Sequence, residues 1–178
     1  MVAYRIDFFC QHGGPVSGPA CNIQPSEYKV FFPDEPALEA WGQRFAPTLR
    51  PGMLVTLQGD LGAGKTTLVR AVLKALGVTG RIKSPTYPLL ETYNVSSLYL
   101  YHFDFYRIKG PLELEDAGFR ECFAGPGLCF VEWPERAAGW LPAPDVTLTL
   151  RVEDAGRTLL AASGSDLGKE CLERTFNA

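Results

Sequence analysis

Residues that build metal clusters and disulfide frameworks are scarce in this chain. It has two histidines and five cysteines, and no two cysteines stand in the C-x-x-C spacing of zinc and redox sites. The odd number of cysteines does not fit a complete set of intramolecular disulfides. We therefore expect free thiols in a reducing compartment and no structural zinc site.

Long apolar runs and an excess of positive charge are also missing. No apolar run approaches the roughly 20 residues that span a bilayer. Asp7 interrupts the short apolar stretch at the N-terminus, and no basic region precedes it. We therefore expect no signal peptide, no membrane contact and a cytoplasmic location. The formal net charge is −3, whereas proteins that capture nucleic acid through bulk charge are usually basic.

The chain does have the length and composition of one globular domain. Its 178 residues suffice to bury a core without disulfides or metals. Because Gly and Pro crowd residues 11–26, we expect residues 1–26 to be a flexible leader. Residues 27–163 are expected to form the compact domain, and residues 164–178 a polar C-terminal tail with room for a helix.

Helix and strand patterns alternate along the expected domain. Apolar residues at spacings of three and four predict helices over residues 34–49 and 65–76, and an acidic stretch predicts a short one over 112–119. Apolar or alternating runs predict strands over 28–32, 53–57, 89–95, 98–103, 128–131, 146–152 and 157–162, the last two as a hairpin. This order predicts an α/β fold, a P-loop NTPase-like three-layer domain whose mixed parallel and antiparallel sheet is flanked by helices.

A phosphate-binding motif lies between the strand at 53–57 and the helix at 65–76. Residues 59–66 match G-x-x-x-x-G-K-[ST] at every fixed position. Glycines allow consecutive backbone N–H groups to point at phosphate oxygens, and the helix N-terminus favours the same anion. A chance match in a Gly-rich loop is the alternative, but the strand and helix on either side are the context that the motif requires. The expected nucleotide-binding residues are Gly59, Asp60, Leu61, Gly62, Ala63, Gly64, Lys65, Thr66 and Thr67.

The side chains of this motif predict a nucleoside triphosphate with Mg²⁺. Lys65 is expected to reach the β and γ phosphates, and the Thr66 hydroxyl is expected to bind Mg²⁺. Readers of guanine carry an Asn-Lys-x-Asp loop, and none of the three asparagines begins one. ATP is therefore the expected nucleotide.

Two acids at strand ends are candidates for the rest of the metal site. Glu132 follows four apolar residues, as a second Mg²⁺ ligand of a P-loop enzyme does, although a solvated acid after a strand is the alternative. Asp104 also ends a strand and is a candidate to hold a metal-bound water or to orient the attacking one. His102 is expected to be a packed strand residue or a hydrogen-bond donor to Asp104 rather than a base.

Further candidates lie in loops around the motif. Thr86, in the loop Ser84–Thr86, is a candidate to offer a hydroxyl to Mg²⁺ or to the γ-phosphate, although an ordinary proline turn is the alternative. Trp133 is expected in the core or at an interface. The sequence does not choose which arginine stabilises transferred charge, and the candidates are Arg81, Arg107, Arg136 and Arg157.

Four short motifs occur in a fixed order, namely Gly59–Thr67, Ser84–Tyr87, His102–Arg107 and Glu132–Glu135. In this order they resemble the TsaE family, bacterial ATPases of tRNA threonylcarbamoyladenosine synthesis, over about residues 27–162. Neither the leader nor the tail has a counterpart in the resemblance. The Pro33-Asp34 pair also departs from the Ser or Thr that often precedes the first helix of this family.

The resemblance implies a cytoplasmic protein that has a mixed sheet flanked by helices and hydrolyses ATP weakly. It implies a TsaD-like and a TsaB-like partner, which transfer the threonylcarbamoyl group to the adenosine 3′ to the anticodon in tRNAs reading ANN codons. The tRNA would be reached indirectly, through that complex. By motif match, Thr66 and Glu132 resemble the Mg²⁺ ligands, Asp104 an acid of the nucleotide or metal site, and Thr86 a residue of a switch loop.

Two other functions are compatible with a phosphate loop. A small-molecule kinase would need an acceptor pocket and usually an arginine-rich lid, and no R-x-x-x-R pair occurs in the chain. A nucleotide-sensing subunit with incidental turnover would share every motif named above. Dependence of ADP formation on an added acceptor distinguishes the first, and function of a hydrolysis-dead protein distinguishes the second.

Overall fold

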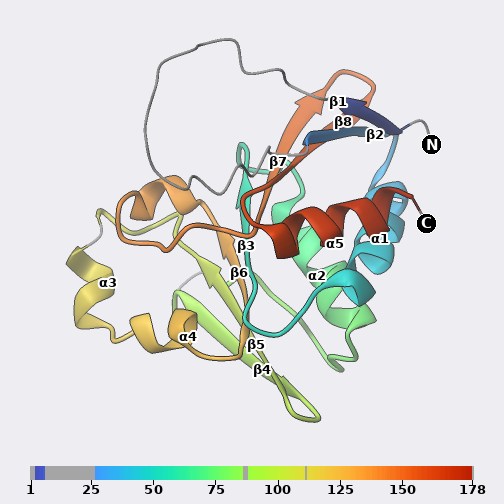
Figure 1. Cartoon of the computed structure of the whole chain (residues 1–178). Helices are drawn as coiled ribbons and strands as arrows, with labels where there is room; N and C mark the ends of the chain where they lie inside the picture. Colours follow the sequence, from blue (N-terminus) through green and yellow to red (C-terminus); the bar gives the residue numbers. More distant parts are fainter. Residues whose placement is uncertain (1–2, 7–26, 86–87, 111, 178) are drawn as a thin grey trace, which may run out of the picture.

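A mixed β-sheet forms the centre of the molecule (Figure 1). The computed structural model describes residues 3–6, 27–85, 88–110 and 112–177. Within these residues the sheet has eight strands in the order β1-β2-β8-β7-β3-β6-β5-β4. The strands are β1 (Ala3–Ile6), β2 (Glu27–Phe32), β3 (Leu54–Gln58), β4 (Leu90–Val95), β5 (Leu98–Asp104), β6 (Leu128–Glu132), β7 (Val146–Glu153) and β8 (Gly156–Ser163).

The parallel part of the sheet lies at its centre. Strand β3 pairs in parallel with both β6 and β7, and β5 pairs in parallel with β6. Every other pairing is antiparallel, including the β7–β8 hairpin and the edge pairs β4–β5 and β1–β2. The predicted α/β fold with a mixed sheet is confirmed.

Strand β6 shows that the centre of the sheet is covered on both faces. All five of its residues are buried, as expected for a strand with helical layers on each side. Leu128 and Phe130 pack into one apolar cluster, whereas Cys129 and Val131 pack into another on the opposite face. The uninterrupted apolar run in the sequence is the consequence of this two-sided burial.

Helices cover the two faces unequally. On one side of the sheet lie α1 (Glu35–Phe45), α2 (Lys65–Ala75) and α5 (Asp166–Phe176), and on the other lie the short helices α3 (Leu112–Asp116) and α4 (Arg120–Ala124) (Figure 1). Two 3₁₀ turns, η1 (Ala46–Thr48) and η2 (Pro134–Ala137), complete the helical elements of the described residues.

The start of α1 follows its sequence signal. The side chain of Asp34 accepts a hydrogen bond from the N–H of Ala37 at 2.9 Å, so it caps the helix. The apolar positions Leu38, Trp41 and Phe45 are all buried on the face that meets the sheet and α2. The helix thus begins within one residue of the predicted start at 34, and it ends at Phe45, before the predicted end at 49.

The C-terminal segment joins the same fold. Helix α5 buries Cys171, Leu172 and Thr175, and its cap Ser165 donates a hydrogen bond to the side chain of Asp145. The other oxygen of Asp145 accepts from the N–H of Leu54 at 2.8 Å. Residues 166–176, expected to lie in a polar tail, thus form a packed helix whose capping residue shares an anchor with the start of β3.

The N-terminal segment differs in part from the expected leader. Residues 3–6 form β1 and pair antiparallel with β2, from Ala3 opposite Val30 to Ile6 opposite Glu27. The remaining residues of the expected leader, 1–2 and 7–26, lie outside the described residues. The Gly and Pro content of residues 11–26 gave no indication of a strand before them.

Candidate functional site

The candidate residues gather at the carboxyl edge of the parallel strands. Because β3, β5 and β6 run in the same direction, their last residues lie at one edge of the sheet. Asp104 stands opposite Glu132 in the register of β5 and β6, and Leu57 stands opposite Glu132 in that of β3 and β6. The loop at residues 59–64 leaves β3 at this same edge and leads directly into α2.

Two glycines of this loop have a backbone conformation and close neighbours that disfavour any side chain. Gly59 has a φ of 130°, and a Cβ there would lie 2.2 Å from the carbonyl oxygen of Leu150. Gly64 has a φ of 106°, and a Cβ there would lie 2.9 Å from Leu38 and 3.1 Å from the guanidinium of Arg157. Because φ is positive at both residues, a side chain at either position would be strained, and at Gly59 it would also overlap the backbone of β7.

The N-terminus of α2 has the features of an anion site. Its capping position is Gly64, which offers no side-chain hydrogen bond to the first N–H groups of the helix. These N–H groups, together with the positive end of the helix dipole, favour a bound anion.

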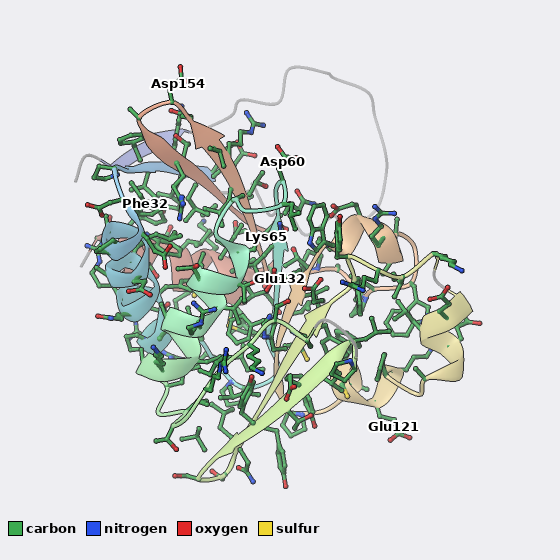
Figure 2. All side chains as sticks on the ribbon, turned by 180° about the vertical axis from the view of Figure 1, so that it is seen from behind. Phe32, Asp60, Lys65, Glu121, Glu132 and Asp154 are labelled. Carbon is green, nitrogen blue, oxygen red and sulfur yellow. The ribbon has the colours of Figure 1, made fainter. Side chains whose placement is uncertain are left out.

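Lys65 is held inside this site rather than extended into water. Its Nζ donates to the carbonyl oxygens of Gly59 at 2.6 Å and of Asp60 at 2.8 Å, and only 4 % of the residue is exposed. Burial lowers the pKa of Lys65 below its ordinary value, and the nearby carboxylates of Glu132 and Asp104 oppose that shift. In Figure 2 Lys65, on α2, lies near Glu132.

Trp133 covers the ammonium group of Lys65. The Nζ atom lies 3.9 Å from the centroid of the indole, a cation–π contact, and Tyr106 packs against the indole with ring centroids 5.0 Å apart. Trp133 adopts a left-handed conformation with φ 60° and ψ 50°, and its N–H donates to the carbonyl of Leu57 at 3.2 Å. A bulky residue in this conformation is strained, and such strain is typical of functional sites.

Thr66 and Glu132 are directly joined. The Thr66 hydroxyl donates to both carboxylate oxygens of Glu132, at 2.9 and 3.0 Å, and Glu132 is only 2 % exposed. The alternative that Glu132 is a solvated acid is therefore wrong. A hydroxyl and a carboxylate are oxygen donors of the type that Mg²⁺ takes beside phosphate.

His102 makes a different contact from the one its sequence neighbours suggested. It is completely buried, as predicted for a packed strand residue. Its Nε2 lies 2.9 Å from Oε1 of Glu132, so the predicted hydrogen bond to Asp104 is wrong. His102 and Asp104 stand two residues apart on β5, so they lie on the same face of the strand. The carboxylate within reach of the imidazole is nevertheless that of Glu132, on the neighbouring strand β6.

Asp104 connects the strand edge to the loop that follows α2. One of its oxygens accepts from the Ser84 hydroxyl, and the other accepts from the N–H of Tyr106 at 3.0 Å. Ser84 belongs to the loop that was expected to contribute Thr86, and Thr86 itself lies outside the described residues. The described part of this loop therefore reaches the site through Ser84.

One pocket of about 420 Å³ holds most of these groups. It is lined by Leu61, Gly62, Gly64, Lys65, Thr66, Thr67, Ser84, Asp104, Tyr106, Arg107, Glu132 and Trp133. Gly59, Asp60 and Ala63 shape the loop without lining the pocket. Of the four arginines that the sequence left open, all of which are described, Arg107 is the one in the lining.

The composition of the pocket bears on which metal ions its residues could hold. Among the described residues, no group of three or more His, Cys, Asp and Glu side chains is arranged to hold a metal ion. The oxygens of Thr66, Glu132 and Asp104 suit a Mg²⁺ ion that takes its other ligands from water and phosphate.

No helix within the described residues has the length and apolar character needed to cross a membrane.

Comparison with known proteins identifies the family. The chain matches the family model "Threonylcarbamoyl adenosine biosynthesis protein TsaE" over residues 32–159. The tRNA threonylcarbamoyladenosine biosynthesis protein TsaE of Haemophilus influenzae is 39 % identical over 152 residues, which cover 83 % of this chain and 96 % of that protein. The protein of the same name from Treponema pallidum is 42 % identical over 123 residues, which cover 68 % of this chain and 90 % of that one.

A solved structure agrees with this result. The crystal structure of YdiB from Bacillus subtilis superimposes with a TM-score of 0.69 at 28 % identity, covering 86 % of this chain and 95 % of that chain. The family match spans the strands β3, β5 and β6 and the loop that together form the pocket. The resemblance seen in the four sequence motifs is thus confirmed, and the chain belongs to the TsaE family of threonylcarbamoyladenosine biosynthesis proteins.

Proposed function

We propose that this protein binds ATP with Mg²⁺ in the pocket at the start of α2 and hydrolyses it in support of tRNA threonylcarbamoyladenosine synthesis. One observation carries the proposal. The Thr66 hydroxyl donates a hydrogen bond to the Glu132 carboxylate, and both groups line the same pocket as Lys65. This is the set of groups that phosphoryl transfer requires around a triphosphate.

The phosphate chain of ATP fits the N-terminus of α2. Its β and γ phosphates would accept hydrogen bonds from the N–H groups of the loop and of the first helical turn. Lys65 would then exchange the carbonyl oxygens of Gly59 and Asp60 for phosphate oxygens. That exchange replaces two dipoles with a formal negative charge, so it favours a highly charged ligand.

Thr66 and Glu132 are the proposed holders of Mg²⁺, with Asp104 beside them on the next strand. When bound, the ion neutralises charge on the β and γ phosphates. The hydrogen bond between Thr66 and Glu132 keeps their oxygens together before the ion binds. Asp104 is proposed to hold a metal-bound water or to orient the attacking one, and Thr86 to act from the switch loop.

The pathway assignment rests on the family. The relatives are named for tRNA threonylcarbamoyladenosine biosynthesis. We infer that this protein acts in the cytoplasm with a TsaD-like and a TsaB-like protein, which perform the transfer to tRNA, while the chain itself supplies ATP turnover. The tRNA is met through that complex.

The test is ATP hydrolysis by the purified protein, alone and then with the TsaB–TsaD pair and tRNA. Lys65→Ala and Glu132→Ala should abolish turnover while circular dichroism and thermal unfolding show a retained fold. Lys74→Ala, in the last turn of α2, and Glu121→Ala, on α4, are matched controls that should leave turnover unchanged.

The outcomes separate the two parts of the proposal. Full turnover by either site variant would show that the site assignment is wrong. Turnover that does not respond to the partners and tRNA would leave the nucleotide site supported and overturn the role in the modifying complex. ADP formation that depends on an added small-molecule acceptor would instead favour a kinase.

A further inference from the structure

A buried histidine stands behind the proposed metal acid. His102, on β5, has no exposed surface, and its Nε2 lies 2.9 Å from Oε1 of Glu132. Glu132 is itself almost fully buried and reaches Thr66 with both oxygens. His102 does not line the pocket, so it acts on any ligand there only through Glu132.

The surroundings of the imidazole select one tautomer. A carboxylate offers only acceptors, so the nitrogen that faces it must carry the hydrogen. The other ring nitrogen, Nδ1, is buried and has no hydrogen-bond partner among the described residues. A hydrogen on Nδ1 would therefore be an unpaired donor in a dry site, which is costly. The geometry therefore favours a hydrogen on Nε2, where Glu132 accepts it, over one on Nδ1.

We propose that His102 is a positioning residue, which holds the Glu132 carboxylate toward Thr66 by donating a hydrogen bond from Nε2. This inference deepens the proposed function and rests on it, because the positioned oxygens are those proposed to hold Mg²⁺.

Geometry explains why such a residue is needed. Glu132 is the last residue of β6, and its side chain has three rotatable bonds. Thr66 contacts the carboxylate from the side of α2 only. The imidazole comes from a neighbouring rigid strand, so it fixes Oε1 from a second direction. Partners of this kind typically tune the binding of a metal by about 10- to 100-fold.

Three substitutions separate positioning from packing. The amide nitrogen of His102→Gln reaches about as far as Nε2 and keeps a donor for Glu132. The amide of His102→Asn reaches only as far as Nδ1, and His102→Met fills similar volume without any donor. Thermal unfolding of each variant in the absence of nucleotide reports the purely structural effect.

The functional readout is calorimetric titration of Mg²⁺ into protein that carries a non-hydrolysable ATP analogue, with steady-state ATPase assays alongside. His102→Met and His102→Asn should weaken Mg²⁺ binding by about tenfold, and His102→Gln should stay close to the wild type. Equal Mg²⁺ affinity in all four proteins would overturn the proposal, as would a defect in His102→Gln as large as that in His102→Met.

A second measurement needs neither nucleotide nor metal. Nitrogen NMR of the imidazole of His102 in the free protein should show a hydrogen on Nε2 and a bare Nδ1. The opposite tautomer would overturn the proposal even if the variants failed to fold. A wild-type protein that shows the expected tautomer but neither binds nor hydrolyses ATP would instead contradict the proposed function and leave the hydrogen bond established.

Discussion

Thr66 and Glu132 meet across two layers of the fold, the first from helix α2 and the second from the end of strand β6. The hydroxyl of Thr66 contacts both oxygens of the carboxylate, at 2.9 and 3.0 Å. These residues are 66 positions apart in sequence, and their contact places the first turn of the helix directly over the edge of the parallel strands. It also gives the proposed metal site two oxygens that are in place before any ligand arrives.

We expect loss of the Thr66 hydroxyl to impair turnover more than folding. Thr66→Val keeps the branched shape but removes the donor to Glu132, and should lower ATP turnover by about 10- to 100-fold. Thr66→Ser restores the hydroxyl and should recover most of the activity. Steady-state ATPase assays over a range of Mg²⁺ concentrations measure this. Equal activity of the Val and Ser variants would argue against a role for the hydroxyl.

A side chain at Gly59 should destabilise the whole domain. The Cβ of Gly59→Ala would stand 2.2 Å from the carbonyl oxygen of Leu150 in a left-handed backbone region. We expect the free energy of unfolding to fall by about 2 kcal/mol or more, because strain and overlap add. Urea denaturation measures the change. Gly110→Ala, where a Cβ meets open space and φ is not positive, is the control and should change stability by less than about 0.5 kcal/mol.

The indole of Trp133 should contribute to nucleotide binding through Lys65. Trp133→Leu removes the ring that lies 3.9 Å from Nζ. In the ligand-free structure the indole holds Nζ beside the proposed phosphate pocket. Without it we expect ATP to bind about two- to fivefold more weakly, the range that corresponds to a cation–π contact of about 0.5–1 kcal/mol. Trp133→Phe keeps an aromatic face and should lie between the two. Fluorescence titration with a labelled ATP analogue gives the dissociation constants, and wild-type affinity in the Leu variant would dismiss the contact.

The buried thiol of Cys171 should make the free energy of unfolding fall as the pH rises above about 9. Burial raises the pKa of its thiol from 9.0 to about 11, although the hydrogen bond between its sulfur and the Thr48 hydroxyl opposes the shift. Between these values the unfolded chain is a thiolate while the folded protein keeps its proton, so the folded state binds more protons and its stability falls as pH rises. Urea denaturation at several pH values should show a steeper fall for the wild type than for Cys171→Ala. Parallel curves for the two proteins would contradict the raised pKa.

Prediction from sequence succeeded where one local pattern determines the outcome. The apolar run at residues 128–131 predicted a strand, and β6 lies there. The glycines of residues 59–64 suit a phosphate loop between a strand and a helix. The apolar spacing of α1 was equally readable. In each of these places propensity, burial pattern and termination signals agree.

The contacts that could not be predicted depend on which strands become neighbours. The chain order places His102 two residues from Asp104, and only the parallel pairing of β5 with β6 brings the imidazole to Glu132. Likewise, the left-handed backbone of Trp133 has no signature in its own residue type, because tryptophan rarely adopts it. Strand β1 has only four residues, which are too few to show an alternating apolar pattern. Its pairing with β2 could therefore not be inferred from the sequence.

Asp145 connects the C-terminal helix α5 to the start of the central strand β3. One carboxylate oxygen receives the N–H of Leu54, where the strand leading to the phosphate loop begins, and the other receives the hydroxyl that caps α5. A protein shortened after Ser163 would keep all four family motifs and still lose one side of this anchor. Ser165 thus lies outside every motif and still contacts the carboxylate to which the first residue of β3 is bonded.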